Sequence, residues 1–88
     1  MGNFIHGREY LDIGDIVEVN CDTQCNIMLL TDTEFSNYKN GQSFTYHGGH
    51  CKFFPARIPA PGSGHWNVII DLGGRSAKIK YSIRVIKR

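Results

Sequence analysis

The chain has 88 residues and a mass of 9.9 kDa, enough for one domain with a thin core and too little for a deep enzyme cleft. Hydrophobic residues make up 41% and charged residues 20%, a balance that excludes a disordered or collagen-like chain. The net charge is only +2, but residues 1–34 hold seven acids and one base, whereas residues 35–88 hold nine bases and one acid. This asymmetry fits either an anionic partner or two halves that neutralise each other.

The predicted elements are mostly short β-strands separated by connections rich in glycine and proline. β-Branched and apolar residues predict strands over residues 14–20, 25–31, 42–47, 50–58 and 65–72. His47-Gly48-Gly49 and residues 59–64 are predicted to be connections between strands. In the last strand, apolar residues from Ala77 to Val85 alternate with Lys78, Lys80, Ser82 and Arg84, which places the apolar set on a core. The sequence therefore predicts one all-β domain over residues 1–88, a compact β-sandwich or jelly-roll-like barrel.

One segment interrupts the strands with the pattern of a helix. Thr31-Asp32-Thr33-Glu34 fits a capping box and Asn40-Gly41 a helix end, so we expect one short helical turn near residues 32–40. Phe35 and Tyr38 lie three residues apart and would share one face of that helix. We expect them to seal an open end of the sandwich, with ligand contact as the alternative.

The sequence also indicates where the protein works. Its longest apolar runs are too short to cross a bilayer, and no signal peptide opens the chain. Three cysteines would leave one thiol unpaired in a disulfide framework. We therefore expect a cytoplasmic protein that does not enter a membrane.

Three stretches of the sequence carry a resemblance to a known family. They are residues 29–41, residues 46–49 and residues 63–74, the last with Gly64-His65-Trp66 leading to Asp71-Leu72-Gly73-Gly74. Over nearly the whole chain they resemble a small bacterial family known as domain of unknown function 1883. The resemblance implies a β-sandwich of this length, sometimes fused to TIR domains, and it brings no assigned activity or catalytic residues.

The fusion to TIR domains implies a link to nucleotides, because TIR domains in bacterial immunity consume or build nucleotides. A partner of such a domain would recognise a signal or a trigger. Because no effector follows the sandwich here, we expect a sensor subunit or a sponge that sequesters an immune signal in anti-phage defence.

Paired glycines stand beside polar residues at two places. Gly48 and Gly49 follow Tyr46, and Gly73-Gly74 precedes Arg75. Successive backbone N–H groups next to glycine can hold an anion, although double glycine between strands is more often a hairpin turn or bulge. Neither stretch matches a phosphate-binding loop or a dinucleotide fingerprint, so no cofactor is expected.

Two further segments supply candidate ligand contacts. Trp66 alternates with Val68 and Ile70 and is expected in the core, which turns His65 and Asn67 to the other face, toward either a ligand or solvent. Arg57 lies between Pro55 and Pro59, and we expect these prolines to stiffen its loop, so that the guanidinium grips a phosphate or stacks on a base.

Metal binding and catalysis find little support in the sequence. His47, His50, Cys51 and the pair Cys21 and Cys25 lack the usual zinc spacing, and on a strand His50 and Cys51 would point to opposite faces. Cys51 with His65 could form a nucleophile and base, but no orienting acid or oxyanion-hole motif accompanies them. We expect neither a metal nor an enzyme.

The function that these observations favour is a non-enzymatic binding module for a small anionic ligand, such as a nucleotide or a cyclic nucleotide. Its predicted contacts are Tyr38, Lys39, Tyr46, Gly48, Gly49, Arg57, His65, Asn67 and Arg75. A chain this small would enclose such a ligand best between copies of itself, so we expect a homo-oligomer. The alternatives are an adaptor sandwich for a protein partner and, less favoured at a net charge of +2, single-stranded nucleic-acid binding.

Overall fold

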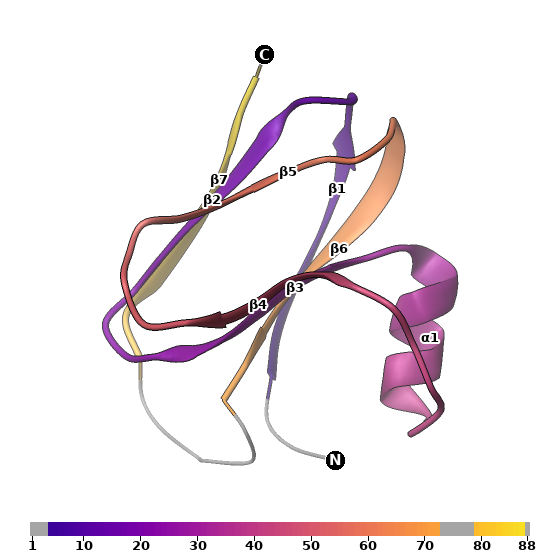
Figure 1. The fold of residues 1–88 in the computed structure, drawn as a ribbon, viewed down its shortest axis with the longest axis horizontal. Coiled ribbons are helices and arrows are strands. Elements are labelled where there is room, and N and C mark those ends of the chain that lie inside the picture. The colour runs from indigo at the N-terminus through magenta and orange to yellow at the C-terminus, as the bar shows by residue number, and fades with distance from the viewer. Residues whose placement is uncertain (1–3, 73–78, 88) are drawn as a thin grey trace.

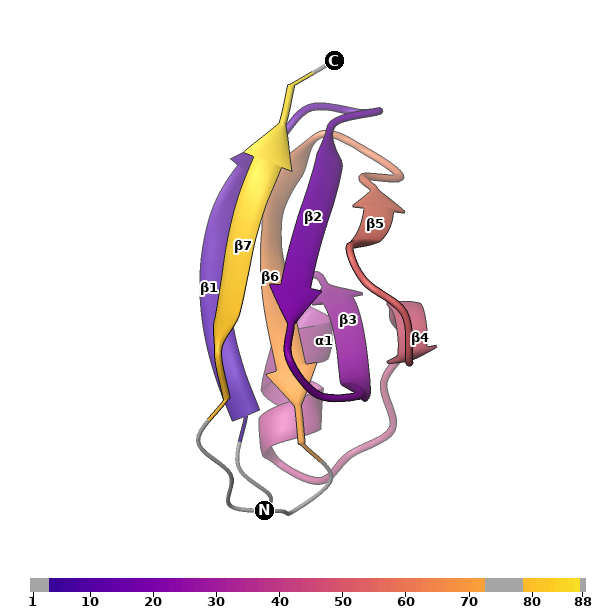
Figure 2. The ribbon, with the colours of Figure 1, turned by 90° about the vertical axis from the view of Figure 1, so that its left-hand side faces the viewer.

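The fold is known from a computed structural model, which describes residues 4–72 and 79–87. The elements follow the order β1 (Phe4–Leu11), β2 (Ile16–Cys21), β3 (Cys25–Leu30), α1 (Asp32–Lys39), β4 (His47–Cys51), β5 (Ala56–Pro59), β6 (Gly64–Asp71) and β7 (Tyr81–Ile86). Antiparallel pairing gives a four-stranded sheet, β1-β6-β3-β4, and a three-stranded sheet, β5-β2-β7, which lie face to face (Figures 1 and 2). The predicted all-β sandwich is confirmed, and its described strands do not close into a barrel.

The main core lies between the two sheets and follows the period of two along their strands. Val17 and Val19 of β2 meet Ile27 and Leu29 of β3, with Trp66, Val68 and Ile70 contributed by β6. Trp66 is only 8% exposed, as its alternation predicts, and its indole N–H donates to the backbone carbonyl of Gly62 at 3.0 Å. The same period places Asn67 on the opposite face of β6.

Helix α1 covers that opposite face of the four-stranded sheet. Phe35 and Tyr38 pack against Met28, Leu30 and Ile69, so the predicted placement of the helix at an open end of the sandwich was wrong. Strands β3 and β6 are therefore buried on both faces. This explains why their sequences run through consecutive apolar residues instead of alternating.

The ends of α1 follow the predicted signals in part. The Thr31 hydroxyl accepts a hydrogen bond from the Glu34 backbone N–H at 3.2 Å, and Gly41 has a φ of +72° just beyond the helix. The Glu34 carboxylate accepts from the Thr45 backbone N–H at 2.6 Å and so holds the chain that leads away from the helix. Within the described residues, no helix has the length and apolar character needed to cross a membrane.

The strand boundaries differ from the predicted ones at several places, and the strand predicted over 50–58 is divided between β4 and β5. Strand β1 was not predicted, because it is an edge strand with polar residues on both faces. The strand predicted over 42–47 is absent, and Gly48 and Gly49 lie inside β4 instead of forming a connection. In β7, Ile83 and Val85 pack on the core as predicted, while Ala77 and Lys78 lie outside the described residues.

Candidate functional site

One side of the sandwich is open, and the edge strands of the two sheets, β4 and β5, lie next to each other there (Figure 2). We call residues 46–53 and 56–61 the β4–β5 edge. Two adjoining hollows of about 520 and 420 Å³ open along it. The first is lined by Tyr46, His47, Gly48, Arg57, Ile58, Pro59, Ala60 and Pro61. The second is lined by Gly48, Gly49, His50, Cys51, Lys52, Phe53, Ala56, Arg57 and Ile58. The linings of both hollows include Arg57 and no aspartate or glutamate.

Two other hollows in the described residues differ in this respect. One, at the C-terminal end of α1, includes Asp71, and the other, beside β7, includes Asp22. A carboxylate in the lining repels an anion, whereas arginine, lysine and histidine side chains attract it. The β4–β5 edge is therefore the better candidate for an anionic ligand.

Gly48 is required by the close packing of the strand edge. Its φ is +123°, and a Cβ placed there would lie 2.2 Å from the backbone oxygen of Ile27 and 3.1 Å from Cδ1 of Ile58. Gly49 also has a positive φ, +152°, but a Cβ there would meet no atom within 4 Å. Gly48 thus lets β4 run close to β3, and it leaves the backbone bare where the two hollows meet.

Arg57 is fixed by an ion pair across the three-stranded sheet. In β2, Glu18 lies directly opposite Arg57 of β5 on one side and Arg84 of β7 on the other. The Nε of Arg57 donates to Glu18 at 3.0 Å, and the Nε of Arg84 donates at 2.8 Å. These two hydrogen bonds hold the pKa of the Glu18 carboxyl below its usual range, and the bond from Arg57 has the larger effect. Arg57 therefore lies on strand β5 and not in a stiffened loop, and Arg84 is held by its hydrogen bond to Glu18.

The ion-paired trio of Arg57, Glu18 and Arg84 keeps a net positive charge across the three-stranded sheet. Glu18 is almost buried, whereas the side chains of Arg57 and Arg84 remain 60% and 69% exposed. Two arginines against one carboxylate leave one net positive charge. The predicted neutralisation of the two halves of the chain is thus partial here.

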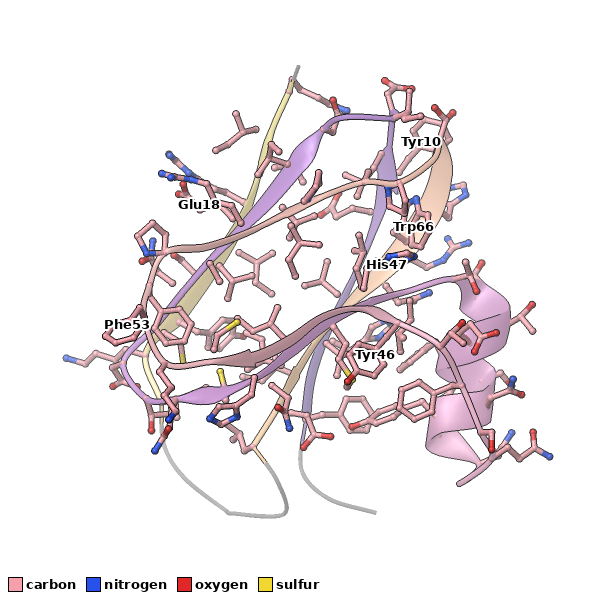
Figure 3. All side chains as sticks on the ribbon, viewed as in Figure 1. Tyr10, Glu18, Tyr46, His47, Phe53 and Trp66 are labelled. Carbon is pink, nitrogen blue, oxygen red and sulfur yellow. The ribbon has the colours of Figure 1, made fainter. Side chains whose placement is uncertain are left out.

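Two aromatic residues lie at the start of β4 (Figure 3). The His47 ring meets the buried Trp66 ring edge to face, with centroids 5.9 Å apart, so the core supports this part of the first hollow. Tyr46 is 48% exposed and contacts Phe44, whose ring centroid lies 5.8 Å away. Tyr46 is therefore partly exposed beside the first hollow, which it lines.

Tyr38 and Lys39 lie elsewhere, at the hollow beyond α1. The Tyr38 hydroxyl donates to Asp71 at 2.5 Å, and its ring packs against Phe4 and Phe44. Burial, followed by this hydrogen bond, raises the pKa of Tyr38. The Lys39 ammonium lies 4.6 Å from the centroid of the Phe35 ring. Both residues thus have structural partners, and the fold does not bring them to the β4–β5 edge.

Asn67 belongs to a polar network beneath the start of α1. It is 1% exposed; its Oδ1 lies 2.7 Å from Nε2 of His6, and its Nδ2 donates to Asp32 at 2.8 Å and to the Leu30 carbonyl at 3.3 Å. Arg8 donates two hydrogen bonds to Asp32, and these, followed by that of Asn67, hold the pKa of Asp32 well below its usual range. The prediction that Asn67 contacts a ligand is therefore wrong, because its buried amide is already hydrogen-bonded to other groups of the protein.

The remaining predicted residues lie on β6, on β4 or outside the described residues. His65 is exposed on the same face of β6 as Asn67, with its ring against that of Tyr10. Arg75 and the glycines before it lie outside the described residues. The His50 ring contacts the side-chain oxygens of Asn26 and Gln24, and Cys51 packs on the core. In the part of the chain that the structure describes, no three His, Cys, Asp or Glu side chains are grouped to hold a metal ion.

Several residues of these two regions were not predicted from the sequence. At the β4–β5 edge they are Glu18 and Lys52, and in the network below α1 they are His6, Arg8 and Asp32. The signal for Glu18 was present, because an acid between Val17 and Val19 in a buried strand needs a cationic partner. The signal for His6 and Arg8 was their spacing of two residues from Phe4 and Tyr10, which places all four on one face of a strand.

The comparisons with known proteins identify the family. No curated protein and no solved structure matches the chain. The family described as a domain of unknown function (DUF1883) matches residues 2–88. The chain, with its β-sandwich and open β4–β5 edge, belongs to this DUF1883 family.

Proposed function

We propose that the protein is a non-enzymatic module that binds a small anionic ligand, of which a nucleotide or cyclic nucleotide is the best fit, at the β4–β5 edge. One observation carries the proposal: two adjoining hollows have Arg57 in common, and their linings contain cationic side chains without a carboxylate. The resemblance to a family fused with nucleotide-handling TIR domains supports the choice of ligand. Such a module would act as a sensor or as a sponge.

The two hollows differ in a way that suits the two halves of a nucleotide. The first is bordered by the Tyr46 ring, Pro59 and Pro61, which suit a flat base. The second is bordered by Lys52, whose ammonium suits a phosphate. Arg57 is common to both and lies between base and phosphate in this arrangement.

Glu18 helps Arg57 in this role by orienting it. A guanidinium carries five N–H donors, and the hydrogen bond to Glu18 uses the one on Nε. A side chain already held in place loses less conformational freedom when a ligand binds. Because the hollows lie on an exposed edge, a second copy of the chain placed across it would enclose the ligand, and we expect binding to favour a dimer.

The proposal is tested by calorimetric titration of AMP, ATP, cyclic mononucleotides and cyclic dinucleotides. Arg57→Ala should weaken binding about 10- to 100-fold, the loss expected from a charged hydrogen bond of roughly 1.5–3 kcal/mol. Arg84→Ala is the matched control, because it also removes one of the two arginines on Glu18 but lines neither hollow. It should change affinity less than about threefold.

Two results would overturn the proposal. In one, no nucleotide binds at millimolar concentration. In the other, Arg57→Ala and Arg84→Ala weaken binding equally and affinity falls steeply with salt, which is the behaviour of a protein that tracks a polyanion.

An adaptor function is the second candidate, and Phe53 favours it. This side chain is 89% exposed beside the second hollow, at the end of the edge strand β4 (Figure 3). An exposed aromatic residue next to an edge strand is a common anchor for a partner that adds a strand. The titration distinguishes the two functions, because an adaptor would bind none of the nucleotides.

A further inference from the structure

Three cysteines from three strands meet at one end of the main core. Cys21 ends β2, Cys25 begins β3 and Cys51 ends β4. Cys25 is buried, whereas Cys21 and Cys51 are partly buried and pack against the same core cluster. None of these three cysteines is in a disulfide in the structure.

The register places two of these thiols opposite each other. Cys25 and Cys51 are direct partners in the antiparallel pair β3–β4, so their side chains leave the same face of the sheet. Directly opposed residues in such a pair have Cα atoms about 4.5–5.5 Å apart, inside the range of roughly 4.4–6.8 Å that a disulfide spans. Cys21 belongs to the other sheet, where its partner is Tyr81. The register thus favours the pair Cys25 and Cys51 over either pair with Cys21.

We propose that Cys25 and Cys51 form a reversible disulfide that ties the edge strand β4 to β3. This inference does not depend on the nature of the ligand. In the oxidation, the Cys51 thiolate attacks oxidised glutathione and releases one glutathione thiolate. The Cys25 thiolate then attacks the Cys51 sulfur of the mixed disulfide and releases the second. Two protein thiols are oxidised and one glutathione disulfide is reduced to two thiols.

The environment of Cys51 makes this reaction slow at neutral pH. Burial raises the pKa of the Cys51 thiol, so the reactive thiolate is scarce until the pH rises. Cys51 is nevertheless the more exposed of the two partners and is the site of first attack. The disulfide is therefore expected under sustained oxidation rather than in a brief exposure.

The disulfide would act on the β4–β5 edge. Strand β4 pairs with β3 alone within its sheet, and it carries His47, Gly48 and Gly49 of the two hollows. Edge strands open locally more readily than central ones. A bond at Cys51 would hold β4 in place and close a ring that includes α1 and Tyr46.

The test is oxidation of the full chain with oxidised glutathione at pH 8, without nucleotide, followed by mass spectrometry under non-reducing conditions. We expect a monomer that has lost two hydrogen atoms, with the crosslink between the peptides of Cys25 and Cys51. Its melting temperature should be roughly 5–15 °C above that of the reduced protein and should return when the thiols are reduced.

Serine variants make the assignment specific. Cys21→Ser should still form the crosslink, whereas Cys25→Ser and Cys51→Ser should instead accumulate glutathione adducts. Oxidation in guanidinium chloride should scramble the pairing, because the register is lost on unfolding. The proposal is overturned if the folded protein yields only glutathione adducts or if the crosslink contains Cys21.

Discussion

On the helix-covered face of the four-stranded sheet, Asn67 and Tyr38 direct their polar atoms at other protein groups, whereas at the β4–β5 edge Tyr46 and Arg57 stay exposed beside hollows. The difference follows from what covers each region. Where α1 excludes water, an unpaired polar atom is costly, and no buried side-chain polar atom of the described residues lacks a partner. At an uncovered edge, a polar group without a protein partner costs little free energy, so it can remain available to a ligand. Polar residues that border open space are thus better candidates for ligand binding than polar residues that form a dense network inside the protein.

The largest difference between the two regions is expected when Asn67 is substituted. Asn67→Ala removes hydrogen bonds to His6, Asp32 and the Leu30 carbonyl, and should lower the free energy of unfolding by about 2–4 kcal/mol. His65→Ala is the control on the same face of β6, and it should change stability by less than about 0.5 kcal/mol. Urea unfolding measures both. Equal stability of the two variants would show that the network does not support the fold.

A second experiment compares the two glycines of β4. Gly48→Ala places a methyl group against the Ile27 carbonyl at a positive φ, and should cost about 2–3 kcal/mol of stability. Gly49→Ala has the same kind of backbone but open space, and should cost about 1 kcal/mol. Thermal unfolding distinguishes them. A Gly48→Ala variant as stable as Gly49→Ala would mean that β4 shifts away from β3 easily, contrary to its close packing here.

The smallest effect concerns acid stability in the two regions. Asp32 below α1 and Glu18 at the edge both have a lowered pKa in the folded state, so each contributes stability above its unfolded pKa near 4. That contribution is lost as the pH falls through the folded pKa. Asp32→Asn and Glu18→Gln should therefore each flatten the loss of stability as the pH falls below about 5. Urea midpoints across this range test both variants, and a variant that loses stability as steeply as the unchanged protein would show that its carboxylate contributes nothing.

Much of the fold could be predicted from local patterns. The alternation around Trp66 gave its face correctly, and Thr31 marked the start of α1. Strand β1 escaped prediction because an edge strand needs no continuous apolar face, so His6, Arg8 and Glu9 obscured its period. The apolar runs of β3 and β6 predicted strands correctly. They did not predict that a helix would cover the second face of these strands.

The candidate site was predictable only in its residue types. Tyr46, Gly48 and Gly49 were chosen as one stretch and Arg57 separately, and the fold brings Arg57 to the same edge. The partner of Arg57 could not be predicted, because Glu18 lies 39 residues away in sequence. Local periodicity also could not reveal that Asn67 is buried, since this depends on where α1 packs.

The position of Glu18 between two arginines has a consequence for how the three-stranded sheet assembles. Strands β5 and β7 reach β2 from distant parts of the chain, so no tight turn dictates how far each slides along it. A slip of one residue would turn Glu18 and its arginines to opposite faces, and a slip of two would leave the carboxylate beside uncharged side chains. Either error in β5 or β7 removes one of the two cationic partners of a nearly buried carboxylate. Glu18 thus favours the observed register of β5 and β7 on β2 over shifted pairings of the same strands.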